Sequence, residues 1–304
     1  MTNKKKSFVL VDIAYILIMV LPIVALIVLR VLFNPASDGV EVSGALIYFT
    51  IPMPIQDLPI TESQVNSLAV TISVLGACLY ITHGMETKKP SARQHIAEFI
   101  VEKTEGMVGE NMGEYFSGFP PFIAAILGLS ALSSLLSLFG LYPPTSDINV
   151  VAGWAILVFA IITYYKLKCG PINYLKSFGD PVPLLAPLNI ISEFATPLSM
   201  AFRHYGNILS GLVISVLVST GLQGLSATLF SWLPSVFGEI PFLQIGLPAV
   251  LSIYFDVFSS CLQAYIFAML TMLYVSNAFP AELYFKRLQE KKKKKQKKLK
   301  IQEK

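Results

Sequence analysis

The chain has 304 residues, of which 54% are hydrophobic and only 14% are charged, and its mean hydropathy is +0.63. Soluble domains usually carry about 25% charged residues, so this composition excludes an ordinary soluble domain and predicts a protein that resides in a lipid bilayer. The net charge of +4 comes from lysines concentrated at the two ends of the chain. A nucleic-acid-binding interpretation would need a folded basic domain, which the sequence lacks.

The first expected element is a membrane-spanning helix over residues 7–33, which follows a short basic N-terminus, residues 1–6. This apolar run is longer than the core of a signal peptide, and no small-residue cleavage signal follows it. A cleaved signal is the alternative. Residues 34–64 are polar and rich in proline, which predicts an exterior loop. The second span is expected at Val65–Thr82.

Residues 83–114 are expected to leave the membrane. Ile96, Phe99, Ile100 and Met107 fall on one face of a helix, and most of the charged side chains lie elsewhere. This pattern is typical of an amphipathic helix that lies on a membrane surface. The lysines of the segment place that helix on the cytoplasmic side.

Four further membrane segments are expected, at Phe119–Leu141, Ile148–Tyr165, Leu184–Thr220 and Ile245–Asn277. The last two exceed the roughly 20 residues that a perpendicular helix needs, so they should tilt strongly, bend or be interrupted, and form a hairpin. The residues from Gly221 onward are expected to join them outside. The sequence thus predicts an all-α integral membrane protein with about six membrane segments.

An even number of spans places both ends of the chain in the cytoplasm, in agreement with the positive-inside rule. Residues 281–304 form the Lys-rich tail, which we interpret as a topology signal attracted to lipid. Contact of this tail with peripheral subunits is the alternative.

Polar residues within the last two segments are the candidate functional residues, because ionisable groups are costly in hydrocarbon. A spacing of 100° per residue places most of them on one polar stripe per helix. The first stripe consists of Ser199, Arg203, Asn207 and Ser210, and the second of Ser252, Asp256, Ser259, Ser260 and Gln263. Glu193 and His204 are further ionisable candidates in the first of these two segments. Such stripes can face a water-filled half-pore or a polar partner, but not lipid.

Arg203 stays protonated, so it cannot relay protons or act as a catalytic base. It can hold a nearby carboxylate in the ionised state and repel a passing cation. A fixed positive gate is therefore allowed, and a structural ion pair with Asp256 or Glu193 is the alternative. Glu193 lies ten residues before Arg203, about 15 Å along a straight helix, which favours a half-channel role for it.

Two motifs resemble subunit a of the rotary F-type ATP synthase. PLSMAFRHYGNILSG contains an arginine followed at i+3 and i+4 by Gly-Asn, and LQAYIFAMLTMLYVSNA resembles the last helix of the family. NIISEF, ESQVNSLAV and KKPSARQHIAEFIVE resemble further segments of it. The resemblance covers about residues 60 to 280. It makes residues 65–280 the family core, to which residues 7–33 and the tail are additions.

The resemblance implies a non-catalytic, stationary subunit beside a ring of c subunits and a subunit b stalk, in the plasma membrane of a bacterium. H⁺ or Na⁺ would enter by one aqueous half-channel, bind a carboxylate on the ring and leave by a second half-channel. Arg203 matches the essential arginine, which displaces the ion from the ring carboxylate and blocks leakage. Asn207, Asp256, Gln263, Glu193 and His204 would assist ion translocation, and the serines would line the route. No cofactor, metal or nucleic acid is expected.

The sequence departs from the family at several of these positions. His204 stands where leucine is usual, Leu212 where many members have glutamate or histidine, and Asp256 where glutamate or histidine is frequent. Asp256 or His204 would compensate for the acid missing at position 212. Purely structural interpretations stay open for Asp256 as a partner of serines and for His204 as a packed side chain.

Asn207 and Gln263 also have a structural interpretation, as hydrogen-bonding links between helices. At the level of the whole protein, an independent secondary transporter or antiporter could use Arg203 and Asp256 on a bound anion. A membrane scaffold without transport is a third possibility. The choice between H⁺ and Na⁺ is expected to lie mainly in the ring.

Overall fold

The computed structural model describes residues 2–33, 44–54, 56–86, 90–168, 170–179, 182–229, 243, 246–279, 285 and 289. Within these residues six helices are long and apolar enough to cross a bilayer. They are Phe8–Leu32, Glu62–Thr82, Pro120–Phe139, Ile148–Lys168, Pro183–Leu229 and Ala249–Ala278. The predicted all-α membrane fold with six membrane segments is therefore confirmed. Apart from positions 285 and 289, the predicted Lys-rich tail lies outside the described residues.

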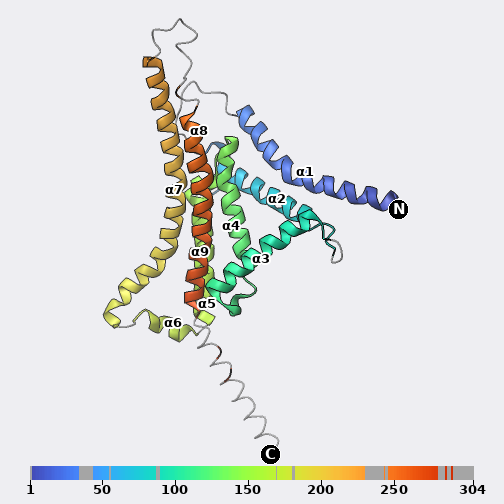
Figure 1. Ribbon diagram of the computed structural model, residues 1–304. Helices are drawn as coiled ribbons and strands as arrows, with labels where there is room; N and C mark the ends of the chain where they lie inside the picture. Colours follow the sequence, from blue (N-terminus) through green and yellow to red (C-terminus); the bar gives the residue numbers. More distant parts are fainter. Residues whose placement is uncertain are drawn as a thin grey trace, which may run out of the picture.

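Four helices form a central bundle (Figure 1). They are α4 (Pro120–Leu135), α5 (Ile148–Lys168), α7 (Ala186–Leu229) and α9 (Ser260–Ala278). α9 contacts each of the other three. Its buried residues include Ala264 and Ala268, whose small side chains let neighbouring helices approach closely in a membrane. Phe267 and Met272 fill the space between them, so the core of the protein is centred on α9.

α7 has 44 residues, which gives a length of about 66 Å at 1.5 Å per residue. The hydrocarbon core of a bilayer is only about 30 Å thick. α7 must therefore be steeply inclined or extend beyond the hydrocarbon. Figure 1 shows its N-terminal part leaning away from the bundle. Pro197 lies in this part of the helix, where a proline removes a backbone hydrogen bond and favours a bend.

The C-terminal end of α7 lies beyond the predicted boundary. The sequence places the connection to the last span from Gly221 onward, but the helix continues through Gly221 and Gly224 to Leu229. A glycine inside a helix costs only about 1 kcal/mol relative to alanine. In lipid, continuing the helix satisfies backbone groups that a loop would leave unpaired. Residues 230–241 of the predicted connection lie outside the described residues.

The last membrane segment is interrupted by a π-helical segment. α8 (Leu247–Ser252) leads into π-helical turns over Ile253–Ser259, and α9 follows directly. Ser260 Oγ donates to the Phe255 carbonyl five residues earlier, at 3.3 Å. The segment packs closely against α7, because a Cβ placed on Gly211 would lie 3.2 Å from the Phe255 Cβ. Such π-helical insertions are frequent at functional sites.

The N-terminal third of the protein lies beside this bundle. α1 (Thr2–Phe33) packs along α2 (Glu62–Thr82), and both cross the direction of α4 and α9 at a steep angle in Figure 1. Between them in the sequence, strands β1 (Ile47–Ile51) and β2 (Leu58–Thr61) form an antiparallel hairpin. This hairpin is a small addition to the all-α prediction.

The helix predicted at the membrane surface is α3 (Ala92–Met112). Val108 and Met112 join the core of the bundle. Ile96, Phe99 and Ile100 are exposed. An apolar face that is left exposed in this way suits a membrane surface.

A cluster of polar and aromatic side chains holds the start of α1 to α2 and α3. Asp12 Oδ1 lies 2.9 Å from His83 Nδ1 and accepts a hydrogen bond from Arg93 at 2.9 Å. The Arg93 guanidinium also lies over the rings of Phe8 and Tyr80, 5.3 and 5.2 Å from their centroids. The cost of a carboxylate inside an apolar helix is therefore offset by a charged partner from α3.

Gly76 is expected to be required where α1 meets α2. A Cβ at this position would lie 2.6 Å from the backbone nitrogen of Met19, which cannot move unless α1 itself moves. Gly76→Ala should therefore lower the thermal unfolding temperature of the purified protein in detergent by several degrees. Gly128→Ala is the matched control, since it adds the same atom inside α4 with nothing within 4 Å. The control should be neutral or stabilising by up to about 1 kcal/mol, and equal responses of the two variants would contradict the prediction.

Candidate functional site

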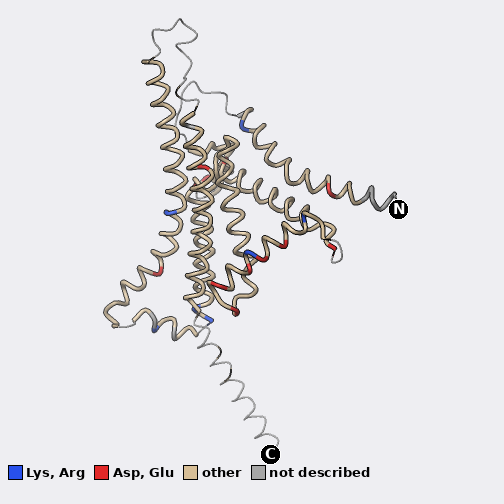
Figure 2. Tube along the Cα trace, in the orientation of Figure 1, with Lys and Arg blue, Asp and Glu red and all other residues tan. Residues whose placement is uncertain are grey.

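Arg203 lies on α7 with its side chain exposed. Among the described residues it has neither an ion-pair partner nor a hydrogen-bond partner. The predicted alternative, an ion pair with Asp256 or Glu193, is therefore not found in this part of the chain. Figure 2 shows that charged residues are sparse along the central bundle and more frequent along α3.

Asn207 lies one turn beyond Arg203 and ties α7 to the π-helical segment. Its Nδ2 donates to Ser259 Oγ at 2.8 Å, and Ser259 Oγ lies 3.1 Å from its Oδ1. Ser210 instead donates to the Gly206 carbonyl of its own helix at 2.6 Å. Ser199, on the same face, is exposed. One polar link between the two long helices is thus made by Asn207 and Ser259, at the level of Arg203.

The polar residues of the last segment are arranged differently from the single stripe predicted at 100° per residue. Asp256 is half-buried and accepts a hydrogen bond from Ser252. Ser260 and Gln263, by contrast, are buried. The π-helical segment explains the difference, because each of its turns contains more residues than an α-helical turn. The predicted stripe is therefore divided into a half-buried part beside α7 and a buried part in the core.

His204 points into the bundle. It is fully buried, and its Nε2 lies 3.4 Å from Ser130 Oγ on α4. The rings of Trp154 and Phe267 meet its imidazole edge to face, with centroids 6.2 and 5.6 Å away. Adjacent positions on α7 are 100° apart, so the side chains of His204 and Arg203 lie on different faces of the helix. Its other ring nitrogen, Nδ1, is buried without a hydrogen-bond partner among the described residues.

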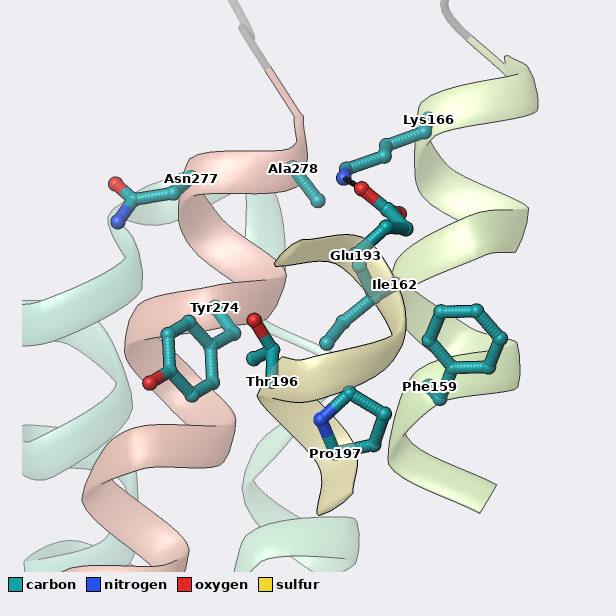
Figure 3. Close-up of a pocket in the computed structure, with 9 residues that line it drawn as sticks. All are labelled: Phe159, Ile162, Lys166, Glu193, Thr196, Pro197, Tyr274, Asn277 and Ala278. Atoms are coloured by element: carbon teal, nitrogen blue, oxygen red, sulfur yellow. Dashed lines mark hydrogen bonds and ion pairs between the residues drawn. The ribbon is translucent and has the colours of Figure 1, made fainter. Parts of the chain in front are cut away.

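Glu193 lies at the other end of the bundle, beside a cavity (Figure 3). Lys166 Nζ donates to its two carboxylate oxygens at 2.7 and 2.5 Å, and Tyr174 donates to Oε1 at 3.4 Å. Burial, followed by the charge of the Glu193 carboxylate, raises the pKa of the Tyr174 hydroxyl, which keeps it protonated as a donor. Lys166 is the partner that sequence reasoning missed, because nothing in the spacing of the chain relates α5 to this turn of α7.

The cavity has a volume of about 190 Å³ and lies between α5, α7 and α9. Its lining residues are Phe159, Ile162, Lys166, Glu193, Thr196, Pro197, Tyr274, Asn277 and Ala278. Figure 3 shows the Lys166–Glu193 pair at one end of it, and the remaining lining includes Thr196, Asn277 and Tyr274 as well as apolar side chains. No group of three or more His, Cys, Asp or Glu side chains that could hold a metal ion occurs within the described residues.

The hydrogen bonds between Asn207 and Ser259 are expected to contribute measurably to packing of the hairpin. Asn207→Leu and Ser259→Ala should each destabilise the protein, and a double-mutant cycle should give a coupling free energy of about 0.6–2 kcal/mol. The measurement is reversible unfolding in mixed micelles of mild detergent and dodecyl sulfate. Ser210→Ala and Ser259→Ala form the control cycle, because Ser210 bonds to its own helix. A coupling near zero between Asn207 and Ser259 would contradict the prediction.

The fold and these groups define a multi-pass membrane protein with polar side chains at membrane depth. Residues 65–276 match the family model described as ATP synthase A chain. ATP synthase subunit a of Bacillus pumilus (strain SAFR-032) is 31% identical over 234 residues, which cover 72% of this chain and 93% of the relative. ATP synthase subunit a 1 of Crocosphaera subtropica (strain ATCC 51142 / BH68) is 30% identical over 214 residues, 69% of this chain and 83% of the relative.

The chain belongs to the ATP synthase subunit a family, the non-catalytic membrane subunits of the Fo sector. The family resemblance predicted from the motifs around Arg203 and Gln263 is thereby confirmed. The protein is accordingly a multi-pass protein of a bacterial membrane and a part of the Fo complex. α1 lies outside the matched residues.

Proposed function

We propose that this chain is the stationary subunit that carries ions to and from a rotating ring of c subunits. In this role it provides two aqueous half-channels, each open to one side of the membrane, and contacts a subunit b stalk. Arg203 displaces the ion from a carboxylate of the ring and blocks a direct leak between the half-channels. The single observation that carries the proposal is the exposed Arg203, which has no partner among the described residues.

A fixed charge of this kind is needed because ions that bypass the ring waste the membrane potential. One elementary charge crossing 100 mV is worth about 2.3 kcal/mol. A guanidinium can pair with a carboxylate through two parallel hydrogen bonds and remains charged throughout. Each ring carboxylate in turn would supply the partner that Arg203 lacks, and the ring would move on when the next carboxylate replaces it.

The polar groups on either side of Arg203 suit the two half-channels. Lys166 and Lys168 in the last turn of α5 mark the cytoplasmic end by the positive-inside rule. Glu193 then lies in the cytoplasmic half, and Asp256 lies in the exterior half. The same orientation places residues 1–6 and 281–304 in the cytoplasm and residues 34–64 outside, around the family core of residues 65–280.

The decisive experiment isolates the chain from its native membrane in a mild detergent. The proposal predicts co-isolation of a c-ring, and ATP synthesis by the reconstituted complex when an ion gradient is imposed. An independent transporter would instead carry ions in vesicles that contain this chain alone. Purification without a ring, together with ion flux by the chain alone, would overturn the proposal in favour of a secondary transporter.

A further inference from the structure

A line of buried polar side chains connects one end of the bundle with His204. It consists of Thr145 in the short helix η3 (Pro144–Ser146), Asp147 directly after that helix, Ser134 and Ser130 on α4, and His204 on α7. We call these five residues the hydroxyl seam. Thr145, Ser134, Ser130 and His204 each have at most 1% of their surface exposed. None of these residues belongs to the two stripes predicted on the last helices, although His204 is one of the candidate residues.

Two pairs of neighbouring side chains in the seam are linked by hydrogen bonds, Thr145 with Ser134 and Ser130 with His204. Asp147, which is half-buried at the end of the bundle, accepts a hydrogen bond from Ser63 of α2. Thr145 Oγ1 lies 2.8 Å from Ser134 Oγ, and Ser130 Oγ lies 3.4 Å from His204 Nε2. Ser134 and Ser130 are one helical turn apart, and Ser134 Oγ donates to the Ser130 carbonyl at 3.0 Å. The two hydroxyls thus lie on one face of α4, and transfer between them needs a side-chain reorientation or a water molecule.

His204 ends the seam with an unsatisfied atom. Its Nδ1 is buried and has no partner among the described residues. The elements packed against it present Ser130 from α4, Trp154 from α5 and Phe267 from α9, none of which is charged. Leaving a buried nitrogen without a hydrogen bond costs about 1–3 kcal/mol. A leucine would avoid this cost, so the imidazole is better explained by a role than by packing.

We infer that the hydroxyl seam conducts protons between the exterior end of the bundle and the depth of Arg203, with His204 as its relay. The inference rests on the proposed function and specifies the proton as the ion of the exterior half-channel. A proton arriving at Ser130 Oγ passes to His204 Nε2, and the imidazole releases its other proton from Nδ1 to a water molecule. Each hydroxyl likewise accepts one proton and gives up another. The seam returns to its initial protonation pattern once the hydroxyl groups have rotated and the imidazole has moved its proton back to Nδ1.

The chemistry of the seam suits a proton better than a sodium ion. Hard cations bind clusters of several oxygen ligands, such as carboxylates, carbonyls and waters. In the seam only Asp147 supplies a carboxylate, and it lies at the end of the bundle rather than beside His204. Imidazole favours softer metals than sodium and changes its protonation near neutral pH. The seam therefore offers a sequence of proton acceptors, and it does not offer a cage for an alkali ion.

The test measures passive flux through the ring-containing complex after the catalytic sector has been stripped off, under a potassium diffusion potential. His204→Gln keeps the size and polarity of the side chain but cannot exchange a proton between two ring nitrogens. This variant should assemble with the ring and lose proton flux by at least about 10-fold. Sodium uptake under the same potential should stay at background in the parent complex. Thr271→Val is the control, because Thr271 is an equally buried hydroxyl that bonds to its own helix.

Parental flux in His204→Gln would show that the histidine is only structural and would overturn the inference, and so would sodium uptake by the parent complex. If His204→Gln fails to assemble, Thr145→Val decides, since it removes a seam hydroxyl at the far end without changing shape. Parental proton flux in Thr145→Val then overturns the inference, and a loss supports it. Failure of the proposed function gives a different result, namely no flux in the parent complex or unchanged coupling in Arg203→Ala.

Discussion

Replacing Arg203 by alanine is expected to lower ATP-driven ion pumping and ion-driven ATP synthesis by at least about 100-fold, which is the usual loss when one preorganised charge is removed from a water-poor site. The residue is exposed on α7 and has no partner among the described residues, so its contribution to packing is small. The variant should therefore accumulate and assemble with the ring at the parental level. Assembly and activity are measured on the same purified complex.

Arg203→Lys separates charge from geometry. Lysine keeps the positive charge but lacks the planar fork that holds a carboxylate through two hydrogen bonds. It should restore part of the block against leakage while leaving pumping strongly impaired. Passive flux after removal of the catalytic sector should be higher in Arg203→Ala than in Arg203→Lys, because only the lysine still repels a passing cation.

Arg30→Ala is the matched control for the loss of one arginine from a membrane segment. Arg30 lies in the last turn of α1 and is 3.8 Å from Glu62, with 38% of its side chain exposed. Arg30→Ala is expected to lower stability, because it leaves the Glu62 carboxylate, which is 5% exposed, without its cation, so pumping is compared per assembled complex. Removal of Arg30 should leave coupled pumping near the parental value. Equal activities of Arg203→Ala and Arg30→Ala would remove the basis for the proposed gate.

The spans follow from composition because each is a long apolar run whose ends carry charge or proline. Ser7–Phe33 and Ile148–Tyr165 are predicted within a few residues of α1 and α5. The end of α7 is not predicted, because Gly221 and Gly224 are typical of loops in water but are tolerated in a helix surrounded by lipid. The local sequence around these glycines does not tell whether water or lipid surrounds them.

Only part of the candidate site could be predicted from the sequence, because several of its contacts depend on how separate helices pack. A helical wheel places Asn207 beside Arg203 correctly, since α7 is a regular helix there. It cannot pair Asn207 with Ser259, or Glu193 with Lys166, because these contacts join separate helices. It also fails at the π-helical segment, where Ser260 is turned into the core. Tertiary packing selects that segment, and no residue type marks it.

Breaking the Lys166–Glu193 pair is expected to give a large loss of stability. The Glu193 carboxylate is 12% exposed and Lys166 is 28% exposed, and their closest contact is 2.5 Å. Lys166→Met would leave a nearly buried carboxylate without its charged partner, which costs about 2–3 kcal/mol once partial exposure is taken into account. Glu193→Gln should cost less, because the more exposed ammonium can turn to solvent.

The double variant Lys166→Met/Glu193→Gln should recover most of the stability that Lys166→Met loses, since no unpaired charge then remains beside the cavity. Unfolding in mixed micelles measures the three free energies. Lys168→Met is the control from the same turn of α5, where the ammonium is exposed and contacts the Tyr115 hydroxyl at 3.0 Å. A double variant as unstable as Lys166→Met would mean that lysine contributes by packing its methylene groups against the lining of the cavity, and that its charge contributes little.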